Sequence, residues 1–363
     1  RDWSAFGRLG LLAGLLDLAG ALIGVAVAWI VFYPLQPILD LNTAYRDMAF
    51  WFACASLFAL SSAPTGIVRA LDRFDVSAYV EAVVPIGRLL AAVGIWLTGP
   101  SLAKFLTAWA AVSLVQAIVY WIAARRLCPA AVTLAHASGI GRAWKENSGI
   151  GHFFLVSSAS STLEAAARQG PLLAVGYLVG TSAAGLFRLA AQLSQALGKL
   201  STLLTRAAYA EINRARVAVD AAQFRKLVTD TSLLAAGAGA GVMILAVLLG
   251  RPLLSLIGGP PFVAAYAILL PLTAAACFDL ASVAFEPVLH STGRARHALA
   301  GRLLGIVALV AGIAAFANDD SAVPVAFAVA LGSLVSYLAL GGLSWRALRA
   351  TGPVRLAGSR PPR

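Results

Sequence analysis

The stretch from Ala183 to Arg214, AAGLFRLAAQLSQALGKLSTLLTRAAYAEINR, contains no proline and has the periodicity of one long helix. With successive residues about 100° apart, its polar residues fall within roughly 40° of one line along that helix. Most of the other residues before Arg206 are Ala, Leu, Gly or small hydroxyl residues. The pattern predicts a helix with one narrow polar stripe, which consists of Arg188, Gln192, Gln195, Lys199, Thr202 and Arg206.

The polar stripe is long enough to cross a membrane. From Arg188 to Arg206 the helix rises about 27 Å, close to the roughly 30 Å thickness of the hydrocarbon core of a bilayer. Charged side chains within a membrane usually face a bundle interior or a wet cavity, so we expect a cationic lining for an anionic substrate. The alternative is an amphipathic helix that lies in the membrane interface, although such helices usually carry a broader and more charged polar face.

The composition of the whole chain is that of a membrane protein. Of its 363 residues 60% are hydrophobic and 12% are charged, whereas about a quarter of the residues of a soluble domain are charged. The net charge of +12 comes from basic residues that collect between apolar segments, as the positive-inside rule expects. We therefore predict an all-α polytopic membrane protein and exclude nucleic acid as a partner.

Apolar windows of membrane-spanning length predict about ten transmembrane helices. Basic residues cluster in alternate connections, which places both termini in the cytoplasm. We divide the chain into an N-terminal lobe of four spans (1–124), a cytoplasmic linker (125–150) and a C-terminal lobe of six spans (151–363). The expected spans are 9–32, 49–68, 78–97, 105–124, 153–179, 183–206, 227–249, 264–289, 298–316 and 323–343.

Acidic residues within the expected spans are candidates for coupling or gating. Asp279 and Glu286 share one helix face and could serve as a proton or sodium site, as could Asp17 in the first span. For Glu286 the alternative is simple solvation near the cytoplasmic end of its span. Glu164 lies four residues before Arg168, so these two either form a structural ion pair or take part in gating.

The chain carries none of the catalytic patterns that we sought. It lacks a Walker A sequence, a nucleophile elbow and paired histidines at metal-binding spacing. We therefore expect no enzymatic activity, no metal site and no cofactor.

Several pieces of the chain resemble the polysaccharide and O-antigen flippases of the multidrug/oligosaccharidyl-lipid/polysaccharide exporter superfamily. The resemblance is sharpest around the polar stripe, and two short basic turns, ALDRFD at 70–75 and STGRAR at 291–296, are similar to the cytoplasmic turns of the two lobes. The pieces around the stripe are Val175-Gly176-Tyr177, Gly180, Ala184-Gly185-Leu186-Phe187 and Glu211 to Arg216.

The resemblance implies two helical lobes around a central cationic cavity, in the inner membrane of a bacterium. Alternating access would move a lipid-linked oligosaccharide, a polyprenyl-diphosphate glycan, from the cytoplasmic to the outer leaflet for export of lipopolysaccharide or exopolysaccharide. Membrane lipid and a coupling proton or sodium ion would be its other partners. The alternative is a drug or anionic-metabolite exporter on the same fold. The implied diphosphate ligands are Arg188, Lys199, Arg206 and Arg168, and the implied sugar ligands are Gln192, Gln195 and Thr202.

The chain differs from this family at its front, where the family has two more spans. The sequence Gly-Arg-Leu-Leu at 87–90 recurs at 301–304, in the third expected span of the first lobe and the fifth of the second. If the lobes are repeats in parallel register, the chain lacks the first two spans of its first lobe. The alternative is a ten-span protein in which this short echo arises by chance.

Overall fold

A computed structural model describes residues 3–37, 43–132, 141–142, 146, 149–215, 221–282, 285, 289, 294–316 and 320–350. Within its helices the side chains of 152–153, 156, 159–160, 200–215, 221–228, 231, 295 and 348–350 are not described. All the regular elements formed by the described residues are helices, which confirms the predicted all-α class.

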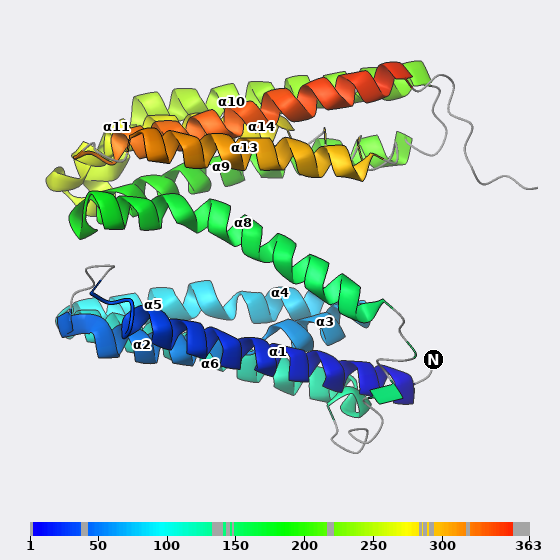
Figure 1. The fold of residues 1–363 in the computed structure, drawn as a ribbon, viewed down its shortest axis with the longest axis vertical. Helices are drawn as coiled ribbons and strands as arrows, with labels where there is room; N and C mark the ends of the chain where they lie inside the picture. Colours follow the sequence, from blue (N-terminus) through cyan, green and yellow to red (C-terminus); the bar gives the residue numbers. More distant parts are fainter. Residues whose placement is uncertain are drawn as a thin grey trace, which may run out of the picture. The chain divides into compact units, whose positions relative to one another are not determined.

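The helices form two compact units, residues 1–159 and residues 160–363 (Figure 1). The boundary falls within α8 (Ile150–Leu178), whereas part of the predicted linker, 125–150, lies outside the described residues. The first unit contains α1 (Trp3–Phe32), α2 (Thr43–Leu57), α3 (Ser62–Ala70), α4 (Phe74–Glu81), α5 (Val83–Leu97), α6 (Leu102–Leu127) and the 3-10 helix η1 (Pro129–Ala131). The second contains α9 (Thr181–Ala215), α10 (Ala221–Gly258), the 3-10 helix η4 (Pro260–Ala265), α11 (Tyr266–Ser282), α13 (Ala295–Ala315) and α14 (Val323–Ala350).

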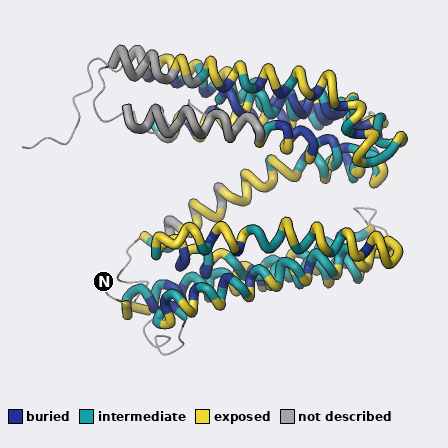
Figure 2. The backbone as a smooth tube through the Cα atoms, turned by 180° about the vertical axis from the view of Figure 1, so that it is seen from behind, coloured by how far each residue is buried: buried dark blue, intermediate teal, exposed yellow. Residues whose placement is uncertain are grey.

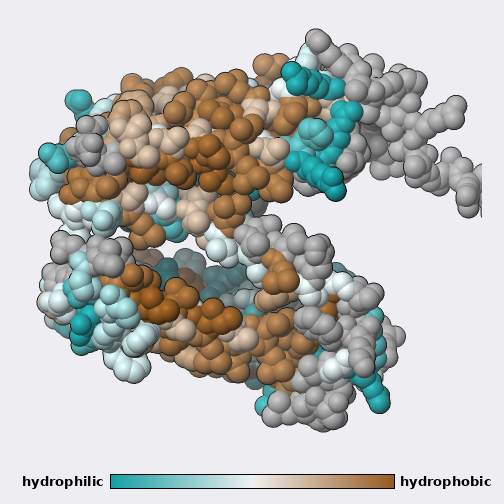
Figure 3. Space-filling view, viewed as in Figure 1, coloured by the Kyte–Doolittle hydropathy of each residue, from teal (hydrophilic) through white to brown (hydrophobic). Residues whose placement is uncertain are grey.

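Within the described residues, eight helical segments are long and apolar enough to cross a membrane. The other two expected spans, 153–179 and 183–206, coincide with the continuous helices α8 and α9, whose polar faces lower their hydropathy. Apolar side chains cover the sides of the helices in both units (Figure 3). The eight segments are Trp3–Phe32, Thr43–Ala70, Phe74–Leu97, Leu102–Leu127, Ser232–Gly258, Pro260–Ser282, Arg296–Ala315 and Val323–Ala347.

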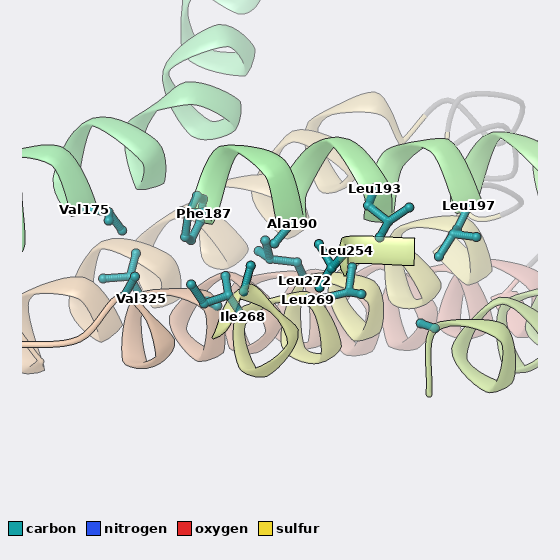
Figure 4. Packing of buried hydrophobic residues seen from close by; sticks show 14 of the residues in the cluster. Val175, Phe187, Ala190, Leu193, Leu197, Leu254, Ile268, Leu269, Leu272 and Val325 are labelled. Carbon is teal, nitrogen blue, oxygen red and sulfur yellow. The ribbon is translucent and has the colours of Figure 1, made fainter. Parts of the chain in front are cut away.

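The core of the second unit is built around one face of α9. That face packs mainly against α10 and α11, and the same buried cluster continues to residues of α14 (Figure 4). Val175 near the end of α8 joins the same cluster and is fully buried. The buried residues from the four main helices are Phe187, Ala190, Leu193, Leu197, Val242, Ala246, Leu254, Ile268, Leu269, Leu272, Val325 and Ala326.

The first unit is joined at one end by a polar network among α3, α4 and α6. The hydroxyls of Ser77 and Tyr120, both buried, lie 3.1 Å apart. Arg69 donates to Ser77 and forms an ion pair with Glu81. Because a buried polar group is costly unless it is hydrogen-bonded, this network fixes how the turn at 71–73 packs on α6.

Small residues allow α13 and α14 to approach closely. A Cβ atom added to Gly305 would lie 2.8 Å from the carbonyl oxygen of Gly332, and Gly301 lies against Leu340 in the same pair. The Gly-Arg-Leu-Leu echo occupies a similar place in the first unit, where Gly87 of α5 lies against Val112 of the next helix, α6. Close packing of small residues is a main source of helix association in membranes.

We expect Gly305→Ala to destabilise the second unit by about 1–3 kcal/mol, because the added methyl group would overlap the backbone of α14. Gly342→Ala is the matched control, since no atom lies within 4 Å of the added Cβ there. Thermal unfolding of the purified protein in detergent measures the difference. Equal unfolding temperatures for the two variants would contradict this account of the α13–α14 contact.

Candidate functional site

The polar stripe forms the exposed face of α9. Arg188, Gln192, Gln195 and Lys199 are all exposed, whereas the residues between them on the opposite face are buried in the core described above. The side chains of the two remaining stripe residues, Thr202 and Arg206, lie outside the described part of the structure. The helical periodicity therefore separates four predicted site residues from the core.

The buried face of α9 argues against an interfacial helix. A helix that lies in the membrane interface places its apolar face in lipid. Here the apolar residues Phe187, Leu193 and Leu197 belong instead to a buried cluster with residues of neighbouring helices, chiefly α10 and α11. The polar stripe therefore lies on a helix that is anchored in the protein.

An ion pair occupies the polar face of α8. Arg168 Nη2 lies 2.9 Å from Glu164 Oε1, and both side chains are more than half exposed, at 64% and 57%. Exposed residues continue along α8 on either side of this pair, from 161 to 166 and at 169 (Figure 2). The pair has the favourable order for a helix, so the charge of Arg168 is compensated within its own helix.

Arg188 has a different kind of partner. Its Nη1 donates to Oε1 of Gln169 on α8 at 3.4 Å. Within the described part of the chain Arg188 forms no ion pair, so its charge is not compensated by a carboxylate there. Gln169 is not among the site residues predicted from the sequence. The two residues lie on consecutive helices, 19 positions apart along the chain. The periodicity within either helix does not pair them, because the contact depends on the angle between the two helices.

Asp279 on α11 is exposed. Ser333 of α14, Arg302 of α13 and Arg168 of α8 are near enough to influence its carboxylate. Three other helices of the second unit thus contribute to its surroundings. The fourth acidic candidate, Glu286, lies outside the described residues. Among the residues that the structure describes, no group of three His, Cys, Asp or Glu side chains could hold a metal ion.

Asp17 is placed at a break in the second membrane segment. The expected span 49–68 is divided into α2 and α3, with residues 58–61 outside both helices. Asp17 Oδ2, from the middle of α1, accepts a hydrogen bond of 2.7 Å from the backbone N–H of Ala63. A carboxylate at the first turn of a helix also interacts favourably with the helix dipole.

Pro64 explains why the helix is broken at this point. It has no N–H, so it cannot form the helical hydrogen bond to the carbonyl of Leu60, four residues earlier. The indole Nε1 of Trp121 in α6 donates to that carbonyl instead, at 2.9 Å. Side chains from α1 and α6 therefore satisfy backbone groups that the break leaves without helical partners, as a hydrocarbon environment demands.

Comparison by sequence gives one relative, and comparison by structure gives solved structures with a similar fold. The chain is 31% identical over 248 residues to the inner membrane protein YghQ of Escherichia coli (strain K12), which covers 66% of this chain and 69% of YghQ. A mutant of the Vibrio cholerae MATE transporter VcmN shares the fold with a TM-score of 0.54 and 16% identity, over 96% of this chain and 84% of that chain. The bent form of VcmN gives a TM-score of 0.48 at 17% identity, with the same coverage of both chains. No protein-family model matches the chain.

We expect Asp17→Ala to destabilise the protein by about 1–3 kcal/mol, because the buried N–H of Ala63 would lose its acceptor. Asp17→Asn keeps an acceptor oxygen and should restore most of this stability. Thermal unfolding in detergent compares the two variants with the wild-type protein. If Asp17→Asn were as unstable as Asp17→Ala, the hydrogen bond to Ala63 would not be the important contribution of this side chain.

Proposed function

This chain belongs to the family of the Escherichia coli inner membrane protein YghQ, and we propose that it transports lipid-linked oligosaccharides across the inner membrane. The substrate is a polyprenyl-diphosphate glycan, which moves from the cytoplasmic to the outer leaflet by alternating access. Such a flippase supplies glycan for lipopolysaccharide or exopolysaccharide. The shared fold with a MATE transporter is compatible with this activity.

The observation that carries the proposal is the exposed polar stripe of α9. A membrane protein gains nothing in stability from exposed charges on a helix whose other face is anchored in its core. Arg188 and Lys199 are separated by eleven residues, so they lie about 16 Å apart along the helix axis. A cationic path of this length suits an anionic group that moves along the membrane normal.

A diphosphate is the anion that this stripe fits best. It must leave water to cross the membrane, and paired charges offset part of that desolvation cost. The guanidinium of Arg188 can donate two parallel hydrogen bonds to phosphate oxygens, while Lys199 contributes a compact charge. The prenyl chain needs no polar site, because it can remain in lipid throughout the cycle.

The amides between the cations suit the glycan. Gln192 and Gln195 are exposed on the same face, and an amide both donates to and accepts from hydroxyl groups. Such contacts bind sugars without demanding one particular glycan. A drug exporter would need a different lining if its drugs were cationic, whereas an anionic-metabolite exporter remains the second candidate because Arg188 and Lys199 would serve it equally.

Coupling to a proton or sodium ion is assigned to the acidic residues of the same unit. Asp279 lies within the span Pro260–Ser282, and Glu164 pairs with Arg168. Either carboxylate can release its basic neighbours to a bound anionic substrate and take up a proton or sodium ion instead. Asp279→Asn should therefore reduce gradient-driven transport.

The test uses a bacterium that lacks the gene and is complemented with wild-type protein, Lys199→Glu or Lys199→Arg. Lipid-linked glycan accessible on the outer leaflet is measured against the total in the cell. We expect the outer fraction to fall without the gene, to stay low with Lys199→Glu and to recover in part with Lys199→Arg, which keeps the charge but changes its geometry.

Comparable amounts of each variant in the membrane are the control for this experiment. Full recovery by Lys199→Glu would contradict a cationic substrate path. An outer fraction that never changes would refute glycan transport, and accumulation of an anionic metabolite in the same cells would favour the second candidate.

A further inference from the structure

The two arginines near the α8–α9 hairpin are in different electrostatic states. Arg168 is paired with the carboxylate of Glu164 at 2.9 Å. Arg188 donates to the neutral amide oxygen of Gln169 and forms no ion pair among the described residues. An incoming anion would have to displace a carboxylate from Arg168 but not from Arg188.

The turn between α8 and α9 brings the ends of the two helices together. Gly180 takes a positive φ of 110° at the turn, and its N–H and that of Val179 both donate to the carbonyl of Val175. One turn from Gly180 along each helix, Gly176 lies near Ala184: a Cβ atom added at Gly176 would be 3.7 Å from the Cβ of Ala184. Burial of Val175 in the core holds the end of α8 beside α9, and the side chain of Arg188 reaches Gln169 from the next helix.

A neutral hydrogen-bond partner orients a guanidinium and leaves its positive charge available to an anion. Arg188 has five N–H donors, and its hydrogen bond to Gln169 uses one of them. A glutamate at position 169 would form a bidentate ion pair instead and cancel the charge. An apolar residue at position 169 would leave the charge of Arg188 uncompensated, but it would not orient the guanidinium.

We propose that Gln169 is a positioning residue that determines the charge specificity of the site, by holding Arg188 toward the anionic head group of the substrate without neutralising it. This inference rests on the proposed function, since it takes the diphosphate of a lipid-linked substrate as the ligand. It assigns the first contact of that diphosphate to Arg188, at a stage when Arg168 is still paired with Glu164.

The test is a binding titration of the purified full chain in detergent micelles. Farnesyl diphosphate is the probe, and farnesol, which has the same chain but no charge, reports non-specific apolar binding. We expect Gln169→Glu and Arg188→Gln each to weaken binding of farnesyl diphosphate by about tenfold or more and Gln169→Leu by about threefold, with farnesol unaffected. Loss of structure would weaken binding of both ligands.

Thr162→Glu is the matched control for the added charge. It places a carboxylate on an exposed position of the same helix, about 10 Å from Gln169 by helical rise, and should leave binding unchanged. The double variant Gln169→Glu with Arg188→Gln should bind no more weakly than Arg188→Gln alone, because the two changes act on one interaction.

The outcomes separate this inference from the function on which it rests. If Arg188→Gln weakens binding of the diphosphate but Gln169→Glu does not, the role of Gln169 is wrong and the proposed function stands. A further loss in the double variant would also overturn that role. If the wild-type protein binds farnesol and farnesyl diphosphate equally, both the proposed function and the inference fail.

Discussion

The packing of the apolar face of α9 is the interaction on which the second unit depends. Phe187, Leu193 and Leu197 are buried in a cluster in which α9 packs chiefly against α10 and α11. That burial secures a helix whose remaining face is too polar to be stable against lipid. The core thus permits a cationic stripe within a membrane protein, and the identity of the buried residues decides which side chains point outward.

A second constraint, the need to satisfy backbone polar groups away from water, governs the first unit. Pro64 interrupts the second membrane segment, and the interruption persists because Asp17 and Trp121 supply the missing partners. The same carboxylate is thus both a structural acceptor and a candidate for coupling. These roles make different demands, because an asparagine can accept a hydrogen bond but cannot exchange a proton.

Electrostatic compensation differs from place to place within the second unit. Glu164 compensates Arg168 within one helix, whereas Gln169 binds Arg188 across the hairpin without changing its charge. Asp279 is exposed and lies within electrostatic reach of Arg302 and Arg168. A carboxylate in such surroundings serves as a counter-ion for arginines, so any ion that it exchanges must compete with them.

The sequence by itself determined the class of the protein and the face of α9 that carries the stripe. Hydropathy is sufficient to assign the class, because a membrane-spanning helix needs about twenty apolar residues. The helical period of 3.6 residues is sufficient to assign the face. The ion pair of Glu164 with Arg168 was also predictable, since it joins residues one turn apart. Only the tertiary structure decided the partners of Asp17 and Arg188, which lie 46 and 19 positions away along the chain. Such contacts depend on how helices pack and turn, and no local periodicity encodes that.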